Sequence, residues 1–344
     1  MTAIQTLTGP VAPDELGIVS MHEYLLKGLP GWHLDPDVKF DRAQAFDNIC
    51  ASLEKFKDAG GRTIVDMSGI TLGRNVPFYK RISEVSGVNV VSATGLDSQS
   101  VGIPGHFRTT ALFYRGDGLK EWKRDIPGHF APSYIGSKEY LMFLFYNELT
   151  EGLVAPGMIR TPIRAGMVKT GCGLDEITHI EELSIRGAAM AARKAGVSLY
   201  ADGLNQVARQ LDLISEEGLE PARIVIAGCD DGRAIDLARD RELAAKGVTI
   251  AYDHVGWEEN GVTDEQRADL VKGMVDAGFT SQVVLSSGAI GCPLGVTPSS
   301  HGFAHLLENF LPRLKAAGLG DSAIDTILVV NPKRILTPGR AEDG

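Results

Sequence analysis

Eight short apolar runs, spread along almost the whole chain, constrain its fold more than any other feature of the sequence. Each run has four to six residues, is rich in β-branched side chains and is bounded mostly by Gly, Asp or Pro. Such runs are typical of strands that are buried on both faces of a parallel sheet. The predicted strands are residues 17–21, 63–66, 88–93, 165–168, 197–200, 224–227, 248–252 and 282–285.

Amphipathic stretches separate these runs. Residues 175–195 place apolar side chains near helical spacing before Gly196, and residues 264–277 and 303–317 behave likewise. Eight strands with helices between them indicate an α/β protein with a closed (β/α)8 barrel, the TIM barrel. No GxGxxG motif follows any strand, as an open dinucleotide-binding sheet would require. One barrel commonly needs about 250 residues, more with insertions. We therefore expect residues 1–344 to form a single domain.

One connection is much longer than the others. Between the third and fourth predicted strands, residues 97–140 form an insertion that begins at the C-terminal end of a strand, the catalytic face of such barrels. It mixes aromatic and cationic side chains, including Tyr114, Trp122 and Tyr134, with Gly and Pro. A lid that contacts substrate and a solvated insertion or subunit contact both agree with this composition.

The net charge of -10 bears on the partners of the chain. No basic stripe is present to neutralise phosphates, so a nucleic-acid partner is disfavoured. The longest apolar runs fall far short of the roughly 20 residues that a membrane span requires, and no signal peptide is visible. The four cysteines are widely spaced without a CxxC pair, which favours reduced thiols. We expect a cytoplasmic protein that acts on a small molecule.

Seven segments, in this order and at barrel spacing, resemble the phosphotriesterase-like family of the amidohydrolase superfamily, from about residue 17 to residue 338. They are SMHEYLL, TIVDMSGITLGRNV, VVSATG, IRAGMVKTG, PARIVIAGCDD, IAYDHVGW and VVNPKRILTP. The resemblance implies a hydrolase that can form a homodimer. It also implies two divalent, mostly zinc-like cations at the barrel mouth, which generate hydroxide and polarise the substrate. The family's ligands are an HxH pair on strand one, a carboxylated lysine on strand four, histidines on strands five and six, and an aspartate on strand eight.

This sequence departs from that ligand pattern. Only His22, the first histidine of the HxH pair, and Lys169, the bridging lysine, match it. The other four positions hold Tyr24, Asp202, Gly228 and Gly288. Glycine has no side chain with which to ligate a metal, and a lysine carbamate is held by the cations that it bridges. The pattern predicts a degenerate metal site in which Lys169 is an ordinary amine.

Lys169 has two interpretations. An amine in a desolvated barrel mouth loses its charge more readily, and it can then act as a base or form a Schiff base with a carbonyl substrate. Alternatively, Lys169 and Asp202 form a buried ion pair that fills the space of the missing cations. Such a pair would keep the amine charged and blunt it as a nucleophile.

His22, Asp231 and His254 are a second candidate group. Asp231 and His254 match the residues that, in the family, pass protons from the metal-bound water. A carboxylate that orients an imidazole makes a general acid or base suited to neutral pH. Tyr24 could add a proton donor or stabilise an oxyanion. Alternatively, these side chains form inherited core hydrogen bonds without chemistry.

Cysteines and a Gly/Ser segment are further candidates. Cys172, Cys229 and Cys292 each follow a predicted strand. With His22 they could hold a single divalent cation such as zinc, one could be a nucleophile, or all are small apolar side chains. Residues 286–291 either cradle a phosphate or leave room for a larger substrate. The predicted substrate contacts are Tyr114, Trp122, Cys172, Cys229, Trp257, Ser287 and Gly288.

The resemblance favours a hydrolase of a small organic ester, lactone or phosphoester that lacks the usual two-cation centre. A metal-free lyase that uses Lys169, and a binding protein without catalysis on the same barrel, are the alternatives. The predicted catalytic residues are His22, Tyr24, Lys169, Asp202, Asp231 and His254.

Overall fold

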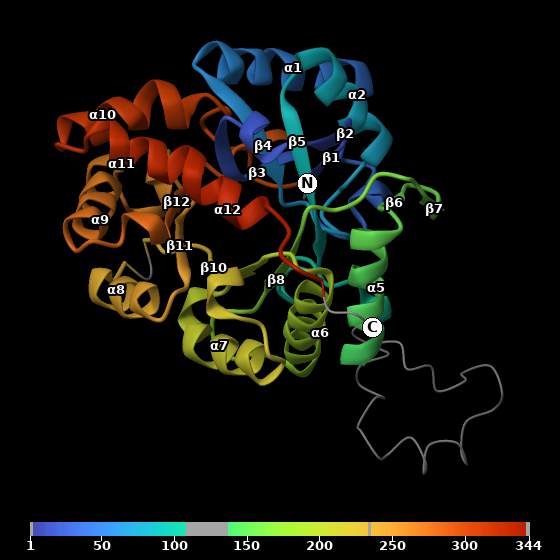
Figure 1. Cartoon of the computed structure of the whole chain (residues 1–344). Helices are drawn as coiled ribbons and strands as arrows, with labels where there is room; N and C mark the ends of the chain where they lie inside the picture. Colours follow the sequence, from blue (N-terminus) through green and yellow to red (C-terminus); the bar gives the residue numbers. More distant parts are fainter. Residues whose placement is uncertain (1–2, 108–136, 233–234, 342–344) are drawn as a thin grey trace.

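The chain folds into a closed barrel of parallel strands, which a computed structural model describes for residues 3–107, 137–232 and 235–341 (Figure 1). The sheet runs in the order β12-β11-β10-β9-β8-β5-β4-β3-β13. β13 (Ile290–Leu294) follows β12 (Val283–Leu285) closely and pairs with β3 (Ile18–Gly28), which closes the barrel. The remaining strands are β4 (Gly61–Asp66), β5 (Asn89–Gly95), β8 (Met167–Gly171), β9 (Leu199–Asp202), β10 (Ile224–Ile226) and β11 (Thr249–Tyr252).

The predicted (β/α)8 barrel is confirmed, and each of the eight predicted strands overlaps an observed one. The first strand is longer than predicted, because β3 continues to Gly28 instead of ending near residue 21. Its second half pairs with β13, from Tyr24 opposite Ile290 to Gly28 opposite Leu294. This added pairing places Tyr24 and Lys27 on a strand at the barrel mouth.

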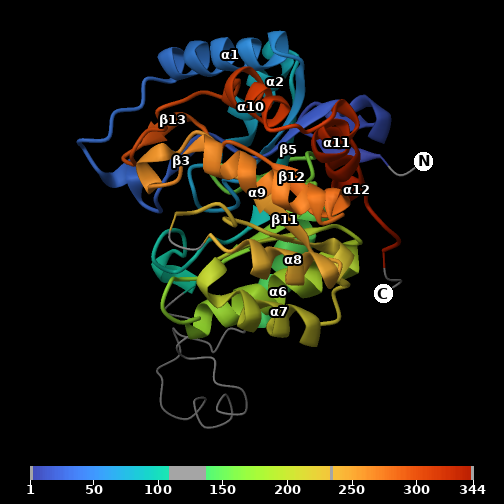
Figure 2. The ribbon, with the colours of Figure 1, turned by 90° about the vertical axis from the view of Figure 1, so that its left-hand side faces the viewer.

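Helices surround the barrel on its outside (Figures 1 and 2). They are α1 (Arg42–Asp58), α2 (Val76–Ser86), α5 (Lys138–Thr150), α6 (His179–Ala195), α7 (Val207–Glu216), α8 (Leu237–Ala245), α9 (Asp264–Asp276), α10 (Leu311–Ala316), α11 (Asp321–Asp325) and α12 (Asn331–Leu336). The predicted helix 175–195 begins later, where Thr178 and Glu181 form a capping box, and Gly196 ends it.

The predicted helix 303–317 is not uniform. Residues Leu306–Phe310 form a π-helical turn, in which the Leu311 N–H donates to the Leu306 carbonyl, and α10 follows. Pro312 lacks the N–H that a regular helix would direct to residue 308. The same combination recurs at Thr326–Val330, where Pro332 follows the π-helical turn.

Two apolar clusters form the core. One fills the barrel interior with side chains such as Val65, Val91 and Met167, and the other packs the strands against the helices. Ile4 and Leu16 belong to the interior cluster, and the Leu16 carbonyl accepts a hydrogen bond from Thr63 near the start of β4. The N-terminal end of the barrel is therefore closed by the chain before β3, and the site must lie at the opposite end.

The connection from β5 to β8 contains the predicted insertion 97–140. Its residues 108–136, including Tyr114, Trp122 and Tyr134, lie outside the described residues. The described part ends in α5, which packs beside α6 (Figure 1). A buried ion pair joins α5 to the barrel, since Glu148 Oε1 lies 2.5 Å from Arg74 Nη2 and Glu148 Oε2 accepts from the Thr94 hydroxyl at 2.6 Å. This ion pair fixes α5, which contains residues 138–140 of the insertion, against the barrel.

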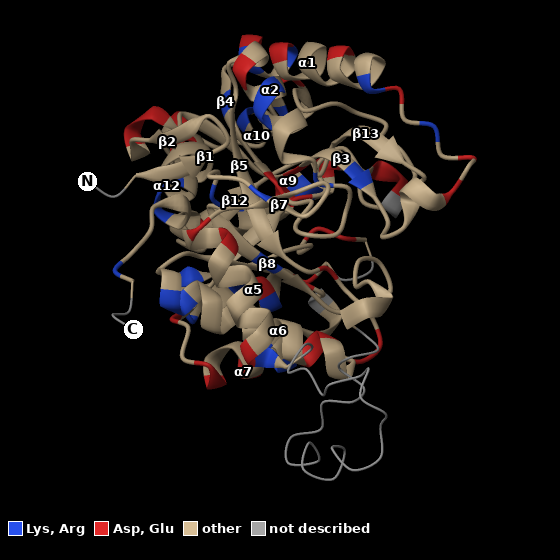
Figure 3. Ribbon diagram, turned by 90° about the vertical axis from the view of Figure 1, so that its right-hand side faces the viewer, with Lys and Arg blue, Asp and Glu red and all other residues tan. Residues whose placement is uncertain are grey.

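Acidic and basic residues are interspersed over the helices on the face that Figure 3 shows, without a continuous basic stripe. Within the described part of the chain, no helix has the length and apolar character needed to cross a membrane.

Candidate active site

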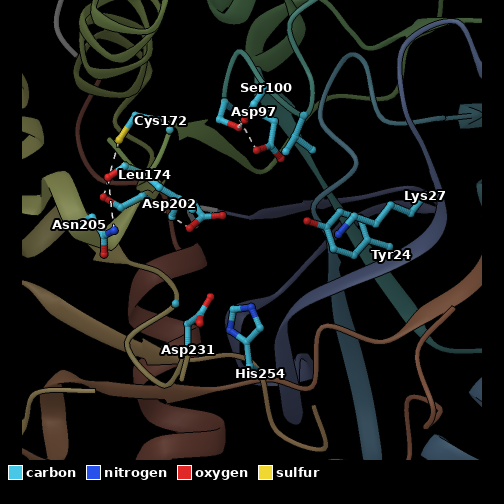
Figure 4. A pocket seen from close by; sticks show the side chains of 15 residues that line it. Tyr24, Lys27, Asp97, Ser100, Cys172, Leu174, Asp202, Asn205, Asp231 and His254 are labelled. Atoms are coloured by element: carbon cyan, nitrogen blue, oxygen red, sulfur yellow. Dashed lines mark hydrogen bonds between the residues drawn. The ribbon is translucent and has the colours of Figure 1, made fainter. Parts of the chain in front are cut away.

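A pocket of about 280 Å³ lies at the C-terminal ends of the barrel strands (Figure 4). Five of the predicted groups line it: Tyr24, Cys172, Asp202, Asp231 and His254. Residues that the sequence did not single out also line it: Lys27, Asp97, Ser98, Ser100, Leu174 and Asn205. The barrel therefore brings together side chains from β3, from β9 and from the segments that follow β5, β8, β10 and β11.

His22 links a buried carboxylate to a tyrosine on the pocket wall. His22 and Tyr24 are two residues apart on β3 and so share one face of the strand. Nδ1 of His22 lies 2.7 Å from Asp253 Oδ2, and Nε2 lies 2.8 Å from the Tyr24 hydroxyl. With the Nδ1–H donating to the Asp253 carboxylate, Nε2 accepts a hydrogen bond from the Tyr24 hydroxyl. Burial raises the pKa of Tyr24 well above its usual value, so this phenol acts as a proton donor and not as a phenolate.

Asp253 holds several of these groups in place. Its carboxylate also accepts hydrogen bonds from the Tyr200 hydroxyl at 2.6 Å and from the Gly228 N–H at 2.9 Å. Burial opposes its ionisation, but His22 and His254 outweigh burial and hold the pKa of Asp253 well below its usual range. Sequence reasoning missed Asp253, although it directly precedes His254 at the end of β11 and could have been found there.

Two buried aspartates stabilise the protonated form of His254. Its Nδ1 lies 3.2 Å from Asp253 Oδ1 and 3.4 Å from Asp230 Oδ1. Burial lowers the pKa of His254, yet the two carboxylates raise it well above its ordinary value. The prediction paired His254 with Asp231, whereas these ion pairs are made by Asp230 and Asp253. Asp231 lies beside His254 on the pocket wall (Figure 4).

Lys169 has a different ion-pair partner from the predicted one. Its ammonium lies 2.6 Å from Asp97 Oδ2 and donates to the Met67 carbonyl at 3.0 Å. The predicted Lys169–Asp202 pair was therefore wrong. The carboxylate that pairs with the amine is that of Asp97, which follows β5. Burial raises the pKa of the Asp97 carboxyl, but the Lys169 charge and hydrogen bond bring it below its usual value.

Asp202 is left as a carboxyl group that faces the pocket (Figure 4). Its Oδ1 accepts from the Gly203 N–H at 2.7 Å. Burial, followed by the charges of Asp97 and Asp253, raises the pKa of Asp202 above its usual value. Gly228 has a positive φ of 69°, and a Cβ placed there would lie 3.6 Å from Asp202 Oδ1 and 3.8 Å from His254 Cε1. Asp202 and His254 therefore border the same small space.

The three barrel-mouth cysteines do not converge on this pocket. Only Cys172 lines it, and its Sγ accepts from Gln210 Nε2 at 2.8 Å, while burial raises the pKa of this thiol to about 12. Cys229 is fully buried, and its thiol points to the Ile226 carbonyl at 3.6 Å. Cys292 lies on β13 and is partly exposed. The predicted roles of Cys229 as a substrate contact and of a shared cysteine–histidine metal site do not fit this arrangement.

Residues 286–289 support the site from outside the pocket. The Ser287 hydroxyl donates to Glu23 Oε1 at 2.7 Å, and its carbonyl accepts from Trp257 Nε1 at 2.8 Å. Gly288 has a φ of 59°, and a Cβ there would lie 3.0 Å from the Asp253 carbonyl oxygen. Ser287, Gly288 and Trp257, predicted as substrate contacts, do not line this pocket.

One group of described residues has the spacing to hold a cation. Donor atoms of Asp230, Asp253 and His254 lie within 4.8 Å of one another. The two carboxylates already have partners, because Asp230 Oδ2 accepts from Arg267 Nε at 3.1 Å and Asp253 accepts from His22.

Comparisons with known proteins agree with the fold. The model of the phosphotriesterase family matches residues 2–113 and 128–336. A phosphotriesterase homology protein of Mycobacterium tuberculosis is 27% identical, covering 97% of this chain and 98% of its own length. A phospho-furanose lactonase of Mycoplasmopsis synoviae is also 27% identical, covering 96% and 91%. The structure of an organophosphorus hydrolase from Deinococcus radiodurans superimposes with a TM-score of 0.81 at 28% identity, covering 97% of each chain.

Proposed function

Because the chain belongs to the phosphotriesterase family, we propose that it hydrolyses a small organic ester, lactone or phosphoester without the family's two-cation centre. The observation that carries the proposal is the pairing of Asp202 with His254 around the space beside Gly228. A base and an acid that border one space within a pocket are the groups that hydrolysis needs.

The donor set at the barrel mouth does not fit two cations. Gly228 and Gly288 offer no side-chain ligand, and the Tyr24 hydroxyl is bonded to His22. A carboxylated Lys169 would place an anion where its amine now meets the Asp97 carboxylate at 2.6 Å. Like charges at that distance repel strongly in a buried site. The residues present therefore support a mechanism without bridging metals.

A single cation at Asp230, Asp253 and His254 is less favoured than the bonds these residues already make. It would have to displace Arg267 from Asp230, or His22 and Tyr200 from Asp253. Arg267 is fully buried, so its guanidinium would lose a charged partner with no solvent to replace it.

In the proposed mechanism, the Asp202 carboxylate takes a proton from a water molecule beside Gly228. The resulting hydroxide forms a bond to the carbonyl carbon or phosphorus, and the bond to the leaving oxygen breaks. The His254 imidazolium gives a proton to that oxygen, and the proton on Asp202 returns to His254 through solvent. The raised pKa of Asp202 strengthens it as a base, and the raised pKa of His254 keeps the acid protonated.

Tyr24 has a supporting role in this scheme. Its hydroxyl points toward the pocket (Figure 4) and is held by the Asp253–His22 pair. A proton donor fixed at that position can stabilise the oxyanion that forms on the substrate.

The lyase alternative needs Lys169 as a free amine. Its nitrogen is instead held in an ion pair with the Asp97 carboxylate and in a hydrogen bond to the Met67 carbonyl. An ammonium cannot attack a carbonyl group, so these contacts support hydrolysis over Schiff-base chemistry.

The test is turnover of a panel of aryl esters, γ-lactones and aryl phosphate esters by the purified chain. Asp202→Asn keeps the size of the side chain but removes the base, and we expect kcat to fall about 100- to 10,000-fold. Asp269→Asn, at an exposed position on α9, is the matched control and should keep wild-type turnover. Full activity in Asp202→Asn would exclude Asp202 as the base. Absence of wild-type turnover on every ester class would favour a non-catalytic binding protein.

A further inference from the structure

Lys27 is a second cation at the pocket, and the hydrolysis mechanism does not use it. It lies on β3 and lines the pocket, with its ammonium 4.0 Å from the centre of the Tyr24 ring. Within the described ranges, no carboxylate lies within 4.0 Å of this ammonium. Lys169 differs, because Asp97 and the Met67 carbonyl neutralise and solvate its charge.

An ammonium in this position is costly without an anionic partner. The Tyr24 ring offers a weak attraction through its π face, which only partly replaces water. Burial lowers the pKa of Lys27. The negative charge of Asp97 acts in the opposite direction and raises it, but burial has the larger effect. An anion that entered the pocket would form a charge-assisted hydrogen bond with this group.

Apolar side chains line the pocket away from Lys27. Leu174 lies across the pocket from Lys27 in Figure 4, and it is 47% exposed, while Val101 on the same pocket lining is 38% exposed. Exposed apolar side chains at a pocket suit an alkyl or aryl group of a ligand. Asp202 and His254 lie between the two sides.

We propose that Lys27 binds a carboxylate of the substrate, so that the chain acts on small esters or lactones that carry an acid group. The inference rests on the proposed function and names its substrate class. A neutral triester or an unsubstituted lactone gains nothing from Lys27, whereas a carboxylated ester gains an ion pair. The apolar side then takes the alcohol or alkyl part, and the scissile bond lies near Asp202 and His254.

The kinetic test compares monomethyl succinate, which has a free carboxylate, with dimethyl succinate, which has none. We expect the wild-type chain to prefer the monomethyl ester in kcat/KM. Lys27→Met keeps the length of the side chain without its charge, and it should reduce the preference about tenfold to a hundredfold. Lys27→Arg should retain most of the preference. Lys246→Met, at an exposed position after α8, loses the same charge and should leave the preference unchanged.

A binding measurement separates this inference from the proposed function. Succinate and glutarate are titrated into the wild-type and variant chains by calorimetry, which needs no turnover. We expect binding to weaken about tenfold or more in Lys27→Met and to remain in Lys27→Arg and Lys246→Met. Lys27-dependent binding without ester turnover would support Lys27 as the carboxylate-binding residue and contradict the hydrolase. Ester turnover with no preference for the free acid, or no binding of either dicarboxylate, would overturn the inference.

Discussion

At the scale of single residues, Lys169 shows how a buried cation depends on a partner from another part of the chain. The sequence identified it as the bridging lysine, with a nucleophile or an ion pair as its present role. The structure places its ammonium against Asp97 and the Met67 carbonyl, with 4% of the residue exposed. A buried pair of this kind contributes little net stability, but the loss of one partner leaves an uncompensated charge.

We expect Lys169→Met to destabilise the fold by about 3–5 kcal/mol, because Asp97 would remain buried and charged. The double variant Lys169→Met/Asp97→Asn should recover most of that loss. Chemical denaturation gives the free energies of unfolding. Lys272→Met is the control, since its ion pair with Asp276 is exposed and is worth less than about 1 kcal/mol. Equal stability of wild type and Lys169→Met would contradict this account.

At the scale of elements, Glu23 connects β3 to the segment between β12 and β13. Its carboxylate accepts hydrogen bonds from the Ser20 hydroxyl at 2.5 Å, the Ser287 hydroxyl at 2.7 Å and the Ala289 N–H at 2.6 Å. Burial raises its pKa to about 7 despite these donors. The contact fixes the segment that carries Gly288 against the strand that carries His22 and Tyr24.

Because the pKa of Glu23 is raised in the folded chain, the free energy of unfolding should fall as the pH rises. Between pH 4.5 and about pH 7, the folded chain holds a proton on Glu23 that the unfolded chain has released. This contribution to stability is therefore lost as the pH rises through that window. From pH 5 to pH 8, the free energy of unfolding of the wild type should fall by about 2–3 kcal/mol more than that of Glu23→Gln.

Urea denaturation at pH 5 and at pH 8 measures this difference. Glu242→Gln, at an exposed position on α8, should retain the wild-type pH dependence. If Glu23→Gln and the wild type change equally with pH, Glu23 does not titrate in this window.

At the scale of the whole molecule, the barrel has one closed end and one open end. Ile4 and Leu16 pack into the interior cluster near the starts of the strands, whereas the pocket lies where the strands end. Barrels of this kind carry their active sites at the end where the strands terminate. In this chain, buried ion pairs and hydrogen bonds occupy the same region, including Lys169–Asp97 and His22–Asp253.

We expect removal of divalent metals to leave the chain intact and active. After dialysis against a chelator, the melting temperature should change by less than about 2 °C, since a lost structural cation would cost several kcal/mol. Elemental analysis should find less than one equivalent of zinc, cobalt or manganese per chain, and added zinc should not raise turnover. Two equivalents per chain, with activity lost on chelation, would restore the two-cation mechanism.

The sequence alone determined the barrel and several of the groups at its mouth. Strand runs and helix caps are local patterns, so the positions of β4, β5 and β11 could be predicted from neighbouring residues. Tyr24, Asp202 and His254 could be predicted because each lies on or just after a barrel strand, where parallel strands all end on one face.

Only the tertiary structure decided which of these groups meet. Asp253 reaches His22 across 231 positions of sequence, and Asp97 reaches Lys169 across 72. Lys27 faces the pocket because β13 extends β3 to Gly28. Such pairings depend on barrel closure and on side-chain reach between distant strands, and a local pattern of residues contains neither.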